Sequence, residues 1–254
     1  MFAVHVQYTP DITIDQALCS CKMNNLNENL QNVRARVAFA CKKAGRDPGK
    51  VAILAVSKKH PAERILALSR LGQSAFGENY VQEALPKIEQ VRPGELEWHF
   101  IGPLQSNKTR EVAQHFQWVQ SVDRVKILKR LSAQRPAVLP DLNVCLQVNI
   151  DREPQKAGIL PEQAGELASA ALSLPRLRLR GLMAIPRPGS AVHAPSESYQ
   201  AMNVLFQELI RSGIELDTLS MGMSADLEAD IMHGSTMVRI GTDLFGRRPD
   251  DGES

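Results

Sequence analysis

Residues 51–58 read VAILAVSK, a run of apolar residues that ends in a hydroxyl and a cation. Short apolar runs rich in β-branched residues are typical of buried strands in a parallel sheet. A lysine at the end of such a strand lies where burial can lower the pKa of its amine, and a neutral amine is a nucleophile. Lys58 is therefore the first candidate functional residue, although the pair Lys58 and Lys59 could also cap the strand as solvated charge, which is the commoner role of lysine.

Similar strands recur along the chain at 51–57, 74–77, 96–101, 117–122, 142–149, 178–184, 216–221 and 236–240. Stretches with helical periodicity lie between them, for example after Pro161 and from Met202 to Ile210. Eight strands that alternate with helices over this length predict an α/β fold, a single closed (β/α)8 TIM-type barrel. A doubly wound open sheet is the alternative, but no GxGxxG motif follows any of these strands.

The barrel is expected to occupy residues 23–248. Four apolar residues, spaced by four, three and four, predict one face of a helix from about Met23 to Lys43: Leu26, Leu30, Val33 and Val37. Residues 1–22 show no sustained period, and we interpret them as an N-terminal extension that is either disordered or upstream of a native start at Met23. Residues 249–254 form a short C-terminal tail.

Composition excludes several classes of function. The chain carries 30 basic and 28 acidic residues, a formal net charge of +2, without a basic block, so it lacks the charge pattern of a nucleic-acid-binding protein. No apolar run approaches the roughly 18 residues that span a bilayer. The first 22 residues also lack the basic and apolar regions of a signal peptide. We expect a cytoplasmic protein that binds neither nucleic acid nor membrane.

The sequence does not indicate a metal site or a disulfide framework. Its four cysteines form no CxxC pair, which suits reduced thiols in a cytosolic protein: Cys19, Cys21, Cys41 and Cys145. The six histidines form no HExxH motif. His99, between Trp98 and Phe100, could be a general acid or base, but such a residue is more commonly a core histidine with a satisfied hydrogen bond.

Functional groups of a (β/α)8 barrel lie where the strands end. Asn79 follows the second strand and offers either an amide to a ligand or an N-cap to the next helix. Ser224 falls at an expected helix N-terminus, which favours an anion. Alternation in the last strand directs Arg239 into the barrel mouth, where it needs an anionic or ring-nitrogen partner. Gly241 and Thr242 can bring backbone N–H groups close to a phosphate.

Six motifs together resemble the pyridoxal phosphate homeostasis protein family: AVSK (55–58), FGENYVQE (76–83), WHFIGPLQSNK (98–108), GLMAIP (181–186), LSMGMS (219–224) and VRIGT (238–242). The resemblance covers roughly Met23 to Arg248. It implies a barrel that binds pyridoxal 5'-phosphate (PLP), similar to the N-terminal domain of alanine racemase.

By this resemblance, Lys58 holds PLP as a Schiff base. Ser224, Gly241 and Thr242 match phosphate-binding positions, Arg239 matches an arginine that faces the pyridine nitrogen, and Asn79 lies in a matching motif.

The resemblance further implies a monomeric protein of intracellular PLP homeostasis that exchanges PLP with PLP-dependent apoenzymes and has no catalytic residue of its own. The alternative is a weak PLP-dependent amino-acid racemase with Lys58 as its base. Racemases of this type take a second base from a separate β domain, and we expect none after Arg248. A phosphosugar-type barrel enzyme would keep the phosphate site but leave Lys58 unmodified.

Overall fold

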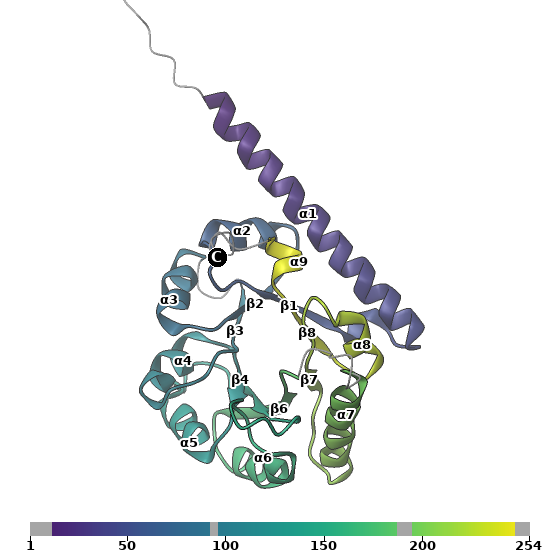
Figure 1. Ribbon diagram of the computed structural model, residues 1–254. Helices are drawn as coiled ribbons and strands as arrows, with labels where there is room; N and C mark the ends of the chain where they lie inside the picture. The colour runs from purple at the N-terminus through teal and green to yellow at the C-terminus, as the bar shows by residue number, and fades with distance from the viewer. Residues whose placement is uncertain (1–11, 92–95, 187–194, 247–254) are drawn as a thin grey trace, which may run out of the picture.

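The computed structural model describes residues 12–91, 96–186 and 195–246. Parallel strands close into a barrel in chain order (Figure 1). They are β1 (Ala52–Val56), β2 (Ala75–Glu78), β3 (Glu97–Phe100), β4 (Trp118–Val122), β5 (Leu142–Gln147), β6 (Leu177–Met183), β7 (Thr218–Ser220) and β8 (Met237–Ile240). Each strand begins and ends within two residues of its expected limits.

The first and last strands close the barrel. Ala55 of β1 pairs with Phe76 of β2 on one side and with Ile240 of β8 on the other. This closure confirms the predicted barrel and excludes the open doubly wound sheet.

Helices connect the strands and form the outer layer of the barrel (Figure 1). They are α1 (Ile12–Lys43), α2 (Ala62–Arg70), α3 (Val81–Gln90), α4 (Thr109–His115), α5 (Val125–Gln134), α6 (Ala164–Leu172), α7 (Pro195–Arg211), α8 (Leu227–Met232) and α9 (Thr242–Phe245). Short 3-10 turns occur at η1 (Pro48–Lys50), η2 (Ser106–Lys108) and η3 (Pro161–Gln163).

The helix α1 begins at Ile12, upstream of the expected start near Met23. No proline or glycine occurs between Asp11 and Lys43, so nothing in the local sequence ends the helix earlier. Its predicted apolar face is buried against the barrel: Leu26, Leu30, Val33 and Val37. The limit at residue 22 stays an expectation, and residues 1–11 and the tail 249–254 lie outside the described residues.

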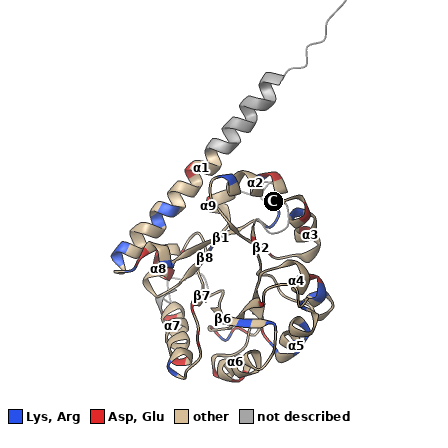
Figure 2. Ribbon diagram, turned by 180° about the vertical axis from the view of Figure 1, so that it is seen from behind, with Lys and Arg blue, Asp and Glu red and all other residues tan. Residues whose placement is uncertain are grey.

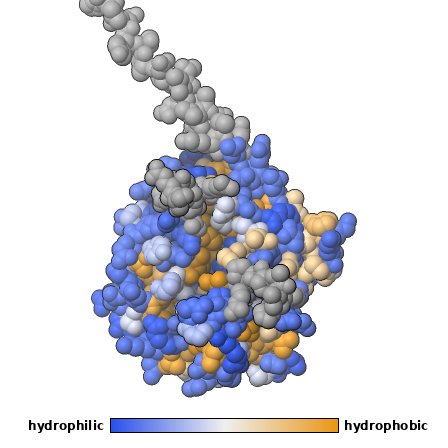
Figure 3. All heavy atoms as spheres, in the orientation of Figure 1, coloured by the Kyte–Doolittle hydropathy of each residue, from blue (hydrophilic) through white to orange (hydrophobic). Residues whose placement is uncertain are grey.

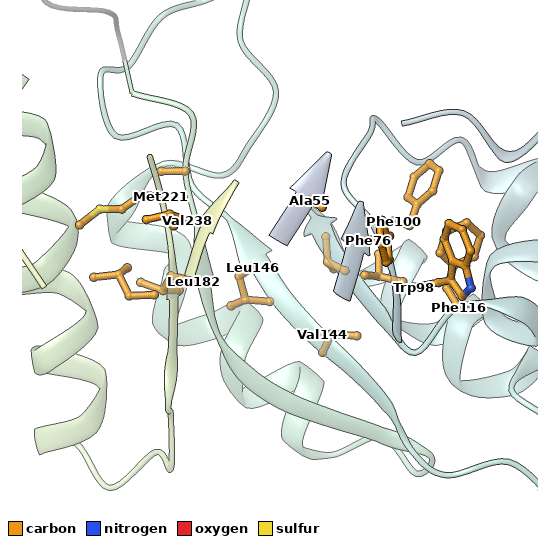
Figure 4. Close-up of a cluster of buried hydrophobic side chains, with 14 of the residues drawn as sticks. Ala55, Phe76, Trp98, Phe100, Phe116, Val144, Leu146, Leu182, Met221 and Val238 are labelled. Carbon is orange, nitrogen blue, oxygen red and sulfur yellow. The ribbon is translucent and has the colours of Figure 1, made fainter. Parts of the chain in front are cut away.

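The outward faces of the strands and the helices share one apolar core, part of which Figure 4 shows. Phe76 of β2 packs against Trp98 of β3 with ring centroids 5.9 Å apart, and Phe100 meets the edge of Phe116 at 5.5 Å. Period-two alternation turns the other residues of each strand into the barrel. A side chain that points inward from a strand near the mouth is therefore held more rigidly than one on a loop.

The surface carries both signs of charge along the described helices (Figure 2). Hydrophobic residues gather in the middle of the face seen in Figure 3, inside a ring of hydrophilic residues. In the described part of the chain, no helix combines the length and the apolar character needed to cross a membrane.

Candidate binding site at the barrel mouth

A cavity of about 310 Å³ lies where β1, β2 and β8 end. The six predicted site residues all line it: Lys58, Asn79, Ser224, Arg239, Gly241 and Thr242. The remaining lining residues are mostly apolar: Val56, Ile101, Ile185, Met223 and Ala225. The barrel thus brings together side chains that are up to 184 positions apart in the sequence, from Lys58 to Thr242.

The backbone on both sides of Lys58 is held by a buried ion cluster. Lys87 of α3 donates to the carbonyl oxygen of Ser57 at 2.9 Å and to Glu78 Oε1 at 2.7 Å. It also donates to Glu83 Oε1 at 2.7 Å, and the same Glu83 oxygen accepts a hydrogen bond from the backbone N–H of Lys59. The residues on either side of Lys58 are therefore held in place by hydrogen bonds: Ser57 through its carbonyl oxygen and Lys59 through its backbone N–H.

Glu78 is the buried acid of this cluster. Its side chain is inaccessible to solvent, and Ser57 Oγ donates to its Oε1 at 2.7 Å. Burial raises the pKa of the Glu78 carboxyl, against the opposing effect of Lys87 and Ser57. Sequence reasoning missed this cluster, although Glu83 and Lys87 stand at the i,i+4 spacing of a helical ion pair.

Asn79 is not the N-cap of α3, because that position is Tyr80. Its Oδ1 is buried and accepts no hydrogen bond from the described residues. A buried acceptor without a donor costs roughly 1–3 kcal/mol. Asn79 was predicted either to cap a helix or to bind a ligand. The unsatisfied Oδ1 favours the second interpretation, in which a ligand supplies the hydrogen-bond donor.

The chain closes tightly over the backbone of Asn79. A Cβ at Gly102 would lie 2.1 Å from the Asn79 carbonyl oxygen, so only glycine fits there.

Arg239 faces the barrel mouth, as the alternation in β8 predicted. It is 5% exposed, and its guanidinium donates to Ser220 Oγ at 2.8 Å and to the Ala184 carbonyl at 2.7 Å. No carboxylate of the described residues forms a salt bridge with it. Burial lowers the pKa of Arg239 to about 10. The guanidinium stays charged at neutral pH and can still bind an acceptor in the cavity.

The prediction that Ser224 begins a helix was wrong. The helix α8 starts at Leu227 with Asp226 as its N-cap, and Ser224 lies in the turn before it. Local pattern could not place this boundary, because residues 224–226 form a turn of their own between β7 and α8.

Arg36 of α1 links the turn that carries Ser224 to the helix α9, which begins at Thr242. Arg36 donates to the Ser224 carbonyl at 2.9 Å, to both Glu228 carboxylate oxygens at 2.7 and 2.9 Å, and to Asp243 at 2.5 Å. Sequence reasoning missed Arg36, since no local pattern links α1 to residues 188 to 207 positions away.

His99 lies inside the barrel and not at the cavity. It is inaccessible to solvent and has ring-nitrogen contacts of 2.8 Å to Glu97 and 2.9 Å to Gln120. Its ring stacks on Trp118 at 5.0 Å. The structure therefore agrees with the interpretation of His99 as a core histidine. Within the described ranges, no three His, Cys, Asp or Glu side chains are grouped to hold a metal ion.

A second hollow, of about 600 Å³, opens at the amino-terminal ends of β6 and β7. Its Arg180 is engaged by Asp217 at 2.6–2.9 Å and lies over the Trp118 ring at 4.6 Å. Barrels of this type carry their sites at the opposite, carboxyl-terminal end of the strands. The smaller cavity at the barrel mouth is therefore the candidate site.

Residues 28–249 match the family described as alanine racemase, N-terminal domain. The pyridoxal phosphate homeostasis protein of Pseudomonas aeruginosa is 54% identical over 226 residues, which cover 89% of this chain and 97% of that relative. This chain belongs to the pyridoxal phosphate homeostasis protein family. Another relative with this name, from Escherichia coli K12, is 51% identical over 229 residues, 89% of this chain and 98% of that relative.

A solved structure similar to this member of the pyridoxal phosphate homeostasis protein family is PipY of Synechococcus elongatus PCC7942 with PLP bound. It is 34% identical with a TM-score of 0.76, covering 87% of this chain and 100% of that one.

PLP fits the residues that the structure places around the cavity. The volume of about 310 Å³ lies at the lower end of the roughly 300–1,000 Å³ typical of small-molecule sites. Asn79 Oδ1, which has no hydrogen-bond partner among the described residues, offers an acceptor. Arg239 offers a cation and Lys58 offers an amine. A Cβ built on Gly241 would meet Val56 at 3.6 Å, an ordinary van der Waals contact, so a larger side chain there would extend beyond this first contact.

Proposed function

We propose that this chain binds PLP at the barrel mouth and takes part in intracellular PLP homeostasis, without catalytic turnover of its own. The observation that carries the proposal is that three kinds of group line one cavity. They are the amine of Lys58, the guanidinium of Arg239 and a rim made of Ser224, Gly241 and Thr242. The names of the relatives and the PLP bound to PipY support the same ligand.

Lys58 is the proposed attachment point. Its Nζ adds to the PLP aldehyde carbon and forms a C=N bond with loss of one water, which is the Schiff base that holds the cofactor. The ion cluster of Glu78, Glu83 and Lys87 fixes Ser57 and the Lys59 backbone, so the amine leaves the strand from a constant position.

The phosphate is assigned to the rim formed by Ser224, Gly241 and Thr242. Two hydroxyls can donate to phosphate oxygens, and the missing side chain of Gly241 lets the backbone approach them. Arg36 holds the Ser224 carbonyl and Asp243, next to Thr242, so this rim is braced from α1.

Arg239 is assigned to the pyridine nitrogen. A guanidinium has only donors, so a ring nitrogen that faces it must accept and stay unprotonated. An unprotonated ring withdraws electrons weakly, which disfavours removal of an α-proton from a bound amino acid. Arg239 would therefore leave the ring a weak electron sink, which is compatible with a binding role.

The test is the mass of the protein after borohydride reduction. Reduced wild-type protein should carry one pyridoxyl group on Lys58, and Lys58→Ala should carry none while its circular dichroism spectrum is unchanged. Lys59→Ala is the matched control and should keep the adduct on Lys58. A pyridoxyl group on Lys59 or elsewhere in the wild type would overturn the assignment.

We further propose PLP-dependent apoenzymes as recipients, a cytoplasmic location and a monomeric state. The described cysteines, Cys41 and Cys145, are free thiols, which suits a reducing compartment. Loaded protein should reactivate an apo-transaminase faster when the two are mixed than when a dialysis membrane separates them. Equal rates would indicate release into solution instead of transfer on contact. Light scattering of the purified protein measures its oligomeric state.

A further inference from the structure

A chain of hydrogen bonds crosses the barrel interior from Arg239 to the opposite end of the strands. Arg239 Nη1 donates to Ser220 Oγ at 2.8 Å, and Ser220 Oγ donates to Gln120 Oε1 at 2.7 Å. Gln120 Nε2 lies 2.9 Å from His99 Nδ1, and His99 Nε2 lies 2.8 Å from Glu97 Oε1. The chain thus links five side chains from β3, β4, β7 and β8.

Arg239 and Glu97, at the two ends of this series of hydrogen bonds, determine which group donates and which accepts in each bond. Arg239 can only donate, so the Ser220 hydroxyl oxygen accepts from it. The Ser220 hydroxyl then donates its own hydrogen bond to Gln120 Oε1. The Gln120 amide nitrogen can then only donate, which makes His99 Nδ1 an acceptor. His99 must carry its proton on Nε2, facing the Glu97 carboxylate.

Burial supports the same protonation state. Ser220, Gln120 and His99 are all inaccessible to solvent, and burial lowers the pKa of His99. A proton on His99 Nδ1 would face the amide nitrogen of Gln120. Turning that amide over would accommodate this proton, but the neutral ring would then set an unprotonated Nε2 against the Glu97 carboxylate, two acceptors 2.8 Å apart. The chain therefore has one satisfied arrangement, and in it Ser220 Oγ presents an acceptor to Arg239.

We propose that Ser220, Gln120 and His99 are positioning residues that fix the Arg239 guanidinium toward the cofactor ring nitrogen. This inference rests on the proposed PLP site and extends it to residues that do not line the cavity. Besides Ser220, the Arg239 guanidinium donates among the described residues to the Ala184 carbonyl, and the buried Asp230 carboxyl interacts with its charge. If Ser220 no longer accepts, a single hydrogen bond is left to hold the orientation of the guanidinium. The hydrogen bond to Ser220 is the second contact, and together with the bond to Ala184 it fixes the plane of the Arg239 guanidinium.

The experiment compares PLP with 1-deaza-PLP, which keeps the aldehyde and the phosphate but has carbon in place of the ring nitrogen. Wild-type apoprotein should bind PLP roughly tenfold or more tightly than the deaza analogue, the size expected for a charge-assisted hydrogen bond. In Ser220→Ala and in the near-isosteric Gln120→Met, PLP affinity should fall toward that of the analogue, whose affinity should stay the same.

Ser132→Ala is the matched control. Ser132 is also buried, at 3% exposed, and donates one hydrogen bond, to the Pro175 carbonyl at 2.7 Å, but it lies on α5. Its ratio of affinities should equal that of the wild type. Circular dichroism identifies which variants fold, and either folded variant is sufficient for the comparison.

The inference would be overturned if folded Ser220→Ala or Gln120→Met kept the wild-type ratio of PLP affinity to 1-deaza-PLP affinity. It would also be overturned if this ratio were near one in the wild type. If the wild type bound neither compound, the proposed PLP site itself would be wrong, and the two failures are thereby distinguished.

Discussion

Lys87 Nζ lies 2.9 Å from the carbonyl oxygen of Ser57, so a buried cation from α3 holds the residue directly before Lys58. The same ammonium satisfies Glu78, whose side chain is inaccessible to solvent. The cluster links the position of the proposed attachment lysine to the stability of the barrel, and both consequences can be measured.

Lys87→Met should destabilise the apoprotein by about 3–5 kcal/mol, because it leaves the buried Glu78 without its cation. Urea unfolding measures the change. Lys108→Met is the control, since Lys108 pairs with Glu111 at 3.5 Å near the surface and should contribute only about 0–1 kcal/mol. Equal losses in both variants would contradict the role given to the buried cluster.

Gly241→Leu should weaken PLP binding by about tenfold or more while it affects pyridoxal much less, because only PLP has a phosphate at this rim. Spectroscopic titration of both compounds gives the two affinities. Gly165→Leu serves as the control, since a Cβ at Gly165 in α6 meets nothing within 4 Å. Equal weakening of PLP and pyridoxal by Gly241→Leu would count against a phosphate site.

Arg36→Gln should lower PLP affinity several-fold and leave pyridoxal affinity nearly constant, because it releases the Ser224 carbonyl and Asp243 together. The side chain of Arg36 is 33% exposed, so its ion pairs should contribute only about 1 kcal/mol or less to stability. Arg34→Gln on the same helix, which contacts the carbonyls of Leu71 and Gly72, should change neither affinity. If Arg36→Gln weakened the binding of PLP and of pyridoxal equally, the result would indicate a general disruption of the barrel.

Stability should fall with rising pH because of Asp230. Its carboxyl group is inaccessible to solvent, and burial raises its pKa to about 8. An unfolded aspartate titrates near pH 3.9. Between about pH 4 and pH 8 the folded chain retains a proton that the unfolded chain releases, so the unfolding free energy decreases through this window and levels off above it.

Asp230→Asn should remove this dependence, so its advantage in urea unfolding over the wild type should grow from pH 5 to pH 9. Glu166→Gln, at an exposed position of α6, should show no such trend. A constant difference between Asp230→Asn and the wild type at all three of pH 5, 7 and 9 would show that Asp230 is ionised throughout.

Purified protein should show no sustained racemase, transaminase or decarboxylase turnover with L-amino acids, because the proposed contact of Arg239 with the ring nitrogen disfavours protonation of that nitrogen. Chiral chromatography and keto-acid assays measure this. Arg239→Glu should weaken PLP binding and raise side reactions. Sustained turnover by the wild type that disappears in Lys58→Ala would favour the racemase alternative.

The sequence by itself determined the strands and the direction of the side chains that leave them. Apolar runs marked each strand within two residues, and alternation in β8 placed Arg239 in the barrel mouth, because period two is a local property of an extended chain. The motifs at Lys58 and Gly241 indicated the family for the same reason, since each is contiguous in sequence.

Only the tertiary structure decided which side chains support these residues. The bond from Lys87 to Ser57 spans 30 positions, that from Ser220 to Gln120 spans 100, and that from Arg36 to Ser224 spans 188. Closure of the barrel creates these contacts, and their distances depend on how distant strands and helices pack. A hydrogen bond between such residues leaves no periodic signal in the sequence, because neither residue constrains the local conformation of the other.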